Sequence, residues 1–327
     1  MRWVKRAQNE RGATIVLMAI VMVALLGIIG LAIDVGAIFA ERRELSRGAD
    51  AAVLAVAEDC ALGVGECTTA AAMATAGAYA DANADDGASA IQSLDLDVEA
   101  RTVHVTTKTI DPDDGTDQFK LYFMRALGID STKVTADAAA AWGYPTSAAA
   151  LPIIISDCEW FLRPGAGVTT TLFFHAGSDT DDCAAQAGSD TDGNDRLPGG
   201  FGWLLTGGDC SAEISSDDWV TEDPGASPSR GCDATALRDI VYQETILVPF
   251  FDDVWGLGAN GTYKIAGFGA FHVTGYNFGG QYKAPSASEA PCSGELRCLE
   301  GFFTTSVVYE GPLGGQNRGV VVVKLIA

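Results

Sequence analysis

Residues 13–33 read ATIVLMAIVMVALLGIIGLAI, a run of 21 residues with no charged side chain and no proline. A helix rises about 1.5 Å per residue, so this run would measure roughly 30 Å, the thickness of the hydrocarbon layer of a bilayer. A cleaved signal peptide is the alternative, but its apolar core is typically about 7–15 residues long. We therefore expect an uncleaved transmembrane helix at residues 13–33.

The flanks of this run predict its orientation. Four basic residues precede it and are opposed only by Glu10, whereas the charges of residues 41–44 cancel after it. Cytoplasmic flanks carry an excess of Lys and Arg. We therefore expect a single-pass protein of the cytoplasmic membrane, with a cytoplasmic N-terminus and an extracytoplasmic C-terminal domain.

Charge is distributed unevenly along the 327 residues. The formal net charge is −22, yet residues 1–48 carry a net +3, so the remainder carries −25. A domain this acidic repels nucleic acid and anionic lipid head groups, and it would attract cationic partners. Nucleic-acid binding is thereby excluded from the expected functions.

All eight cysteines follow the apolar run, which is typical of disulfides in an oxidising compartment. They are Cys60, Cys67, Cys158, Cys183, Cys210, Cys232, Cys292 and Cys298. Zinc is the alternative, but the close pairs are too far apart for the usual ligand spacing, and only three histidines are present. Loop entropy favours pairing of sequence neighbours, Cys60–Cys67, Cys158–Cys183, Cys210–Cys232 and Cys292–Cys298. Exchange among the four middle cysteines stays open.

The helix is expected to continue beyond the membrane, from about residue 12 to residue 59. No proline occurs before Pro112, and an apolar stripe at spacings of three and four is suited to packing on a domain. That stripe consists of Leu45, Ala49, Ala52, Val53 and Val56. Small residues that could permit helix packing are Gly27, Gly30, Ala32, Gly36 and Ala40. Asp34 lies at the outer end, where we expect a boundary carboxylate that reaches water.

Residues 31–57, LAIDVGAIFAERRELSRGADAAVLAVA, contain Asp34-Val35-Gly36, an Arg-rich turn at residues 42–45 and an Ala-rich stretch from Ala49. This pattern resembles the TadE/TadG-like proteins of tight-adherence (Flp) pilus systems. Residues 134–143 show a weaker resemblance to the same family. The resemblance implies a membrane-inserted, pilin-like accessory component of a pilus or export machine. Prepilins carry a glutamate five residues after the cleaved glycine, whereas Leu17 follows Gly12 at that distance, so the resemblance implies the uncleaved, anchor-like branch.

The sequence predicts an α+β fold in four parts. These are a cytoplasmic flank with the membrane helix and its extension (1–59), a pilin-like α+β unit (60–143), a linker (144–150) and a β-rich, disulfide-bonded domain (151–327). In the pilin-like unit we expect helices at 68–83 and 118–127, a strand pair at 95–110 and a last strand at 134–142. Strands are expected in the β-rich domain at 151–156, 168–174, 245–251, 262–276, 302–309 and 319–326.

Catalytic signatures are missing from the sequence. There is no phosphate-binding Gly-rich loop, no GxSxG elbow and no HExxH. The duplicated AGSDTD segments at 176–181 and 187–192 faintly resemble a calcium loop, but Asp195 and Phe201 stand where glycine and glutamate are needed. We expect no enzyme activity, no cofactor, no metal and no small-molecule substrate.

Two functions of different classes fit these features. The first is a structural or accessory component of a tight-adherence pilus or related secretion machine, with the machine's other subunits as partners. The second is a membrane-tethered surface-binding, adhesin-like module that uses the helix only as an anchor.

Overall fold

The computed structural model describes residues 11–163, 165, 167–174, 201–206, 208, 210–225, 227–255, 261–309 and 311–326. The chain divides into two compact units. The first contains the residues up to Cys60, Gly65–Ala141 and the last residues from Leu325. The second contains Ala61–Val64 and Trp142–Lys324.

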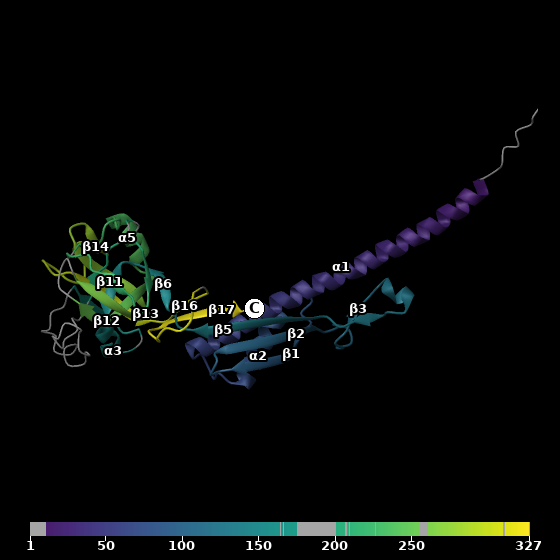
Figure 1. Ribbon diagram of the computed structural model, residues 1–327, viewed down its shortest axis with the longest axis horizontal. Helices are drawn as coiled ribbons and strands as arrows, with labels where there is room; N and C mark the ends of the chain where they lie inside the picture. The colour runs from purple at the N-terminus through teal and green to yellow at the C-terminus, as the bar shows by residue number, and fades with distance from the viewer. Residues whose placement is uncertain are drawn as a thin grey trace, which may run out of the picture. The chain divides into compact units, whose positions relative to one another are not determined.

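Helix α1, Arg11–Leu62, is a single continuous helix of 52 residues, visible in Figure 1 as the long curved ribbon. Its first half is apolar and exposed at nearly every described position, and its composition and length suffice to cross a membrane. Its second half is buried on one face. Every member of the predicted stripe, Leu45, Ala49, Ala52, Val53 and Val56, has at most 2% of its surface exposed. The structure thus confirms that the predicted stripe is a packing face, and it divides α1 into an exposed apolar half and a packed half.

The first unit surrounds the second half of α1 with a helix and a sheet. Helix α2 spans Thr69–Ala82, and the Thr68 side chain accepts the N–H of Ala71 at its start. Three strands of the unit pair antiparallel in the order β1-β2-β5, as part of a five-stranded sheet. These strands are β1 (Ser89–Asp97), β2 (Thr102–Thr109) and β5 (Thr135–Gly143). The predicted helix at 68–83 and strand at 134–142 are confirmed, and the predicted pair at 95–110 begins earlier, at Ser89.

Helix and sheet are joined by polar as well as apolar contacts. The buried Thr107 hydroxyl lies 3.0 Å from the carbonyl oxygen of Leu45 and 3.2 Å from that of Ala136. Leu45, Val134 and Ala136 form a small apolar core, against which Ile38 packs. The packing face of α1 therefore starts at Ile38, close after the apolar run ends.

Residues 118–127 do not form the predicted amphipathic helix. They contain the short strand β3 (Phe119–Lys120) and a single 3-10 turn, η1 (Met124–Leu127). Gly128 ends η1 with a φ of 82°, a left-handed conformation that glycine adopts without strain. The chain then returns in β4 (Ser131–Thr132), which pairs with β3. We call residues 117–133 the arm.

The second unit is β-rich, as predicted. Its main sheet has the order β8-β15-β13-β12-β7-β9, and β11 and β14 both pair with β13. The bounds of these strands are β7 Ile153–Ser156, β8 Thr170–Phe173, β9 Phe201–Trp203, β11 Trp219–Thr221, β12 Thr245–Trp255, β13 Thr262–Gly279, β14 Tyr282–Ala284 and β15 Cys298–Thr304. The other elements after residue 142 are α3 (Asp157–Leu162), α5 (Ala234–Val241), β6 (Ser147–Ala150), β10 (Ala212–Ser215), β16 (Ser306–Val308) and β17 (Val320–Ile326). Strands β16 and β17 pair with each other in parallel and are not part of the main sheet.

Aromatic side chains fill the core of this second unit. Trp203, Phe201 and Phe278 meet edge to face, with ring centroids 5.0–6.3 Å apart. In the same unit the buried Asp157 and Arg318 form a bidentate ion pair, with N–O distances of 2.6 and 2.8 Å. The residues expected to be a linker, 144–150, are not all linker, because 147–150 pair as strand β6 with β10.

The disulfides join sequence neighbours. Cys60 at the end of α1 bonds Cys67, and in the second unit Cys210 bonds Cys232 and Cys292 bonds Cys298. Cys158 is also disulfide-bonded, and its predicted partner Cys183 lies outside the described residues. The acidic duplication and the calcium-like loop, residues 176–200, lie outside them as well.

Candidate functional site

The candidate site is the C-terminal end of the apolar run, where the arm folds back onto α1. Asp34, on α1, accepts the backbone N–H groups of Tyr122, Phe123 and Met124 at 3.0, 2.8 and 2.6 Å. These groups lie at the start of η1, which has no side-chain cap of its own. The first N–H groups of a helical turn lack internal partners, so Asp34 acts as a cap supplied by another element.

The expectation for Asp34 was wrong in one respect. We predicted a boundary carboxylate that reaches water, but only 1% of the residue's surface is exposed. Water is replaced by three main-chain donors, and a carboxylate in a low-dielectric setting needs such partners. Asp34 therefore holds the arm in place.

Gly30 lies one helical turn before Asp34 and makes room for the arm. A Cβ atom at Gly30 would lie 2.7 Å from ring atoms of Phe123, closer than real contacts allow. Residues four apart share a helix face, so Gly30 and Asp34 contact the arm side by side. Glycine at position 30 permits the Phe123 ring to lie directly on the α1 backbone.

The other predicted packing residues face away from the arm. Ala32, Gly36 and Ala40 are exposed, and a Cβ atom at Gly36 would meet nothing within 4 Å. At 100° per residue, Gly36 lies about 200° around the helix from Asp34. The structure thus separates two faces of α1, one that holds the arm and one that is bare. Packing of the bare face on another helix stays a prediction.

An apolar cavity of about 370 Å³ opens where the arm meets α1. It is lined by Ala24, Gly27, Ile28, Leu31, Phe123, Ala126 and Leu127. Four of these belong to the predicted membrane span and three to the arm. No polar side chain lines the cavity, so it could hold only an apolar group.

The base of the arm carries ion pairs. Lys120 lies 2.8 Å from Asp111, which is buried and also accepts the N–H of Asp113. The Lys120 ammonium and these N–H donors hold the pKa of the Asp111 carboxyl below its ordinary value, although burial opposes them. Lys133 and Asp117, at the two ends of the arm, pair at 2.8 Å. Nearer the tip, Arg125 and Asp130 form a further pair at 3.2 Å, with both side chains exposed.

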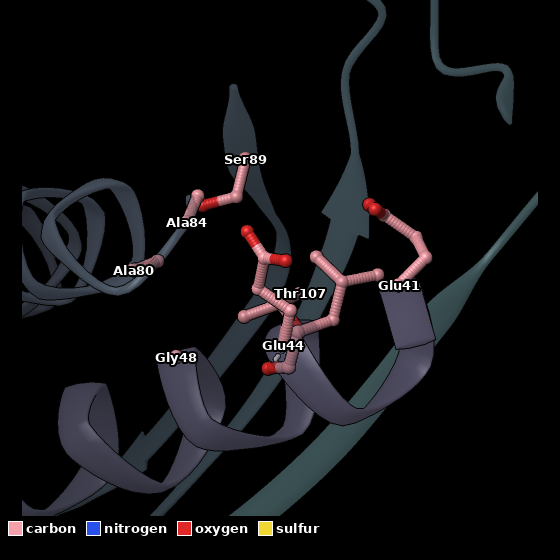
Figure 2. Close-up of a pocket in the computed structure, with 8 residues that line it drawn as sticks. Glu41, Glu44, Gly48, Ala80, Ala84, Ser89 and Thr107 are labelled. Carbon is pink, nitrogen blue, oxygen red and sulfur yellow. Dashed lines mark hydrogen bonds between the residues drawn. The ribbon is translucent and has the colours of Figure 1, made fainter. Parts of the chain in front are cut away.

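A second hollow lies between α1, α2 and the sheet, and Figure 2 shows its lining residues. Glu44 accepts the N–H of Asp85 there, and α2 comes so close that a Cβ atom at Gly48 would lie 3.4 Å from Ala80. Burial raises the pKa of Glu41 despite a hydrogen bond with Thr109. The hollow has no room for even one water molecule, so it is a packed joint between elements.

Metal ligation finds no support in the described part of the chain. Among the described residues, no three His, Cys, Asp or Glu side chains gather closely enough to hold an ion. The buried Asp157–Arg318 pair in the second unit is satisfied by its own bidentate geometry and by Gln316. These charges are therefore structural.

Sequence reasoning missed the arm's contact with α1. The signals available were a single carboxylate beside a long apolar run and a glycine one turn earlier. Neither identifies a partner, because the arm offers main-chain N–H groups, which every residue but proline carries.

Comparison with known proteins finds a family match for the first helix. Residues 12–59 match the model of a family described as putative Flp pilus-assembly TadE/G-like. The match covers α1 almost completely, including Gly30 and Asp34, and confirms the resemblance found in the sequence. No curated protein and no solved structure matches the chain.

Proposed function

We propose that this chain is a membrane-anchored structural component of a tight-adherence (Flp) pilus assembly or a related secretion machine. In this proposal α1 crosses the cytoplasmic membrane once, the basic N-terminal flank stays in the cytoplasm, and both folded units lie outside. The protein's task is to position and assemble subunits, and catalysis has no part in it.

One observation carries the proposal. The stretch that matches the TadE/G-like family is a helix whose first half is bare and apolar and whose second half is built into a folded unit. A flexible tether would not need a rigid continuation of the membrane helix. A helix that continues unbroken transmits the orientation of the span to the unit outside, which suits a part of an ordered assembly.

The bare face of α1 offers the contact surface for such an assembly. Ala32, Gly36 and Ala40 recur every four residues, the spacing with which helices approach closely in lipid. Their exposure leaves that face open to a second helix. The pilus or secretion subunits are the expected partners.

Piliation of a deletion strain complemented with variants tests the proposal. Gly36→Leu places a leucine on the bare face, whereas Val35→Leu places the same side chain at an exposed neighbouring position about 100° away. We expect surface pili, counted by electron microscopy and in sheared fractions, to fall at least tenfold with Gly36→Leu and little with Val35→Leu. Immunoblots control for equal protein levels.

Two results would contradict the proposal. Normal piliation in the deletion strain would remove the chain from pilus assembly. Normal piliation with lost surface adhesion would favour the tethered binding module. Topology is tested separately, with a membrane-impermeant thiol label on Val98→Cys in intact cells, which should react if the first unit is outside.

A further inference from the structure

We propose that the tip of the arm, residues 122–129, enters the outer leaflet of the membrane beside α1 and gives the chain a second contact with lipid. This inference rests on the proposed single crossing by residues 13–33. It adds a lipid-binding element that lies outside the stretch matched by the family model, residues 12–59.

The depth of the tip follows from its contacts with α1. Phe123 lies on Gly30, and Ala126 and Leu127 line the cavity together with residues as far back as Ala24. Ala24 precedes the end of the span by nine residues, which is about 14 Å along the helix. A bilayer leaflet contributes roughly 15 Å of hydrocarbon, so the arm lies alongside a part of α1 that lipid surrounds.

The chemistry of the tip suits the interface. Tyr122 and Leu127 expose 78% and 67% of their surface, and Phe123 and Ile129 are also exposed. Exposed apolar side chains in water are unfavourable, whereas aromatic residues favour the head-group region of membranes. Arg125 is the only charged residue between 122 and 129. It pairs with the exposed Asp130 at 3.2 Å, and its long stem can bring the guanidinium to the phosphates.

Main-chain hydrogen bonding supplies the independent observation. Lipid cannot satisfy backbone N–H groups, so a segment that enters it must satisfy them internally. Asp34 accepts hydrogen bonds from three of them. Carbonyl oxygens of the arm accept those of Leu121, Ala126, Gly128 and Ile129. Insertion of the tip into lipid thus explains both why the Asp34 carboxylate is buried at the membrane boundary and why the tip exposes apolar side chains.

The arrangement also fixes what the tip contacts. The exposed apolar side chains of the tip adjoin the exposed apolar side chains of the span in α1, so the two form one apolar surface. The cavity between them is lined only by apolar side chains, which suits a lipid acyl chain. A partner helix at this position is the alternative, and the experiment below distinguishes it.

Depth-dependent quenching in vesicles tests the proposal. Full-length protein with Leu127→Cys carries an NBD label and is reconstituted in phosphatidylcholine vesicles with or without lipids brominated on their acyl chains. The described native cysteines are all disulfide-bonded and do not compete for the label. Leu26→Cys, exposed within the span, is the positive control, and Val98→Cys, exposed in the turn between β1 and β2, is the negative control.

We expect the label at 127 to be quenched at least half as strongly as the label at 26, and the label at 98 to be quenched less than a tenth as strongly. Quenching at 26 but not at 127 would overturn the proposal and leave the membrane span intact. No quenching at 26 would instead refute the crossing itself. The label at 127 could instead be shielded by a neighbouring protein copy and stay unquenched by brominated lipid. That result would identify a partner helix and would also overturn the lipid contact.

Discussion

The Asp34 carboxylate accepts the main-chain N–H of Phe123 at 2.8 Å, across 89 positions of the chain. Phe123 in turn rests on Gly30, one turn earlier on the same helix. A polar contact and a steric one thus hold the same arm to the end of the apolar run. The two contacts can be removed separately, which makes their roles measurable.

Removing the carboxylate should release the start of η1. In Asp34→Ala the N–H groups of residues 122–124 lose their acceptor, so their hydrogen exchange in detergent or vesicles should accelerate at least tenfold. Asp130→Ala removes only the exposed pair with Arg125 and serves as the control. Unchanged exchange at 122–124 in Asp34→Ala would contradict the capping role.

Bulk at Gly30 should displace Phe123 without unfolding the unit. Gly30→Leu places side-chain atoms where the Phe123 ring lies, whereas Gly36→Leu points into open space. We expect Gly30→Leu to raise hydrogen exchange throughout 119–132 and to leave the β1-β2-β5 sheet protected. The Gly36→Leu variant should match the wild type in both regions, and equal effects of the two would refute the assignment of faces.

Acid should loosen the base of the arm. The pKa of Asp111 is lowered in the folded protein, so its ionised form stabilises the fold. That stabilisation is complete above the unfolded pKa, about 4, and is lost as the pH falls through the lower folded pKa. Exchange protection of β3 and β4 should therefore decline as the pH falls below about 4 in the wild type. Lys120→Met should move the decline to higher pH, and an identical profile would count against the pairing.

The buried ion pair of the second unit should matter for stability. Arg318→Met leaves the Asp157 carboxylate buried without its partner, which typically costs about 3–5 kcal/mol. Chemical denaturation with a probe in the second unit measures the loss. The double variant Arg318→Met with Asp157→Leu should recover part of it, because no lone charge remains. A single variant as stable as the wild type would show that the pair is dispensable.

Local sequence determined the parts whose physics is local. An uninterrupted apolar run specifies the first half of α1, and a stripe at helical spacing specifies the buried face from Leu45 to Val56. Loop entropy pairs the nearest cysteines, as Cys60–Cys67 shows. The long strand β13 was predictable from its composition, because Tyr, Ile, Phe, Val and Thr favour strands, and most of its residues are buried.

Tertiary structure alone decided the rest. Residues 118–127 have helical periodicity, yet they form a hairpin-like arm because Asp34 binds three of their N–H groups. Short strands such as β6 and β9 form only because a partner strand satisfies them. Main-chain donors are the same in every residue, so a contact made with them leaves no trace in the sequence of the arm. That is why the sequence marked Asp34 and Gly30 but could not reveal what they hold.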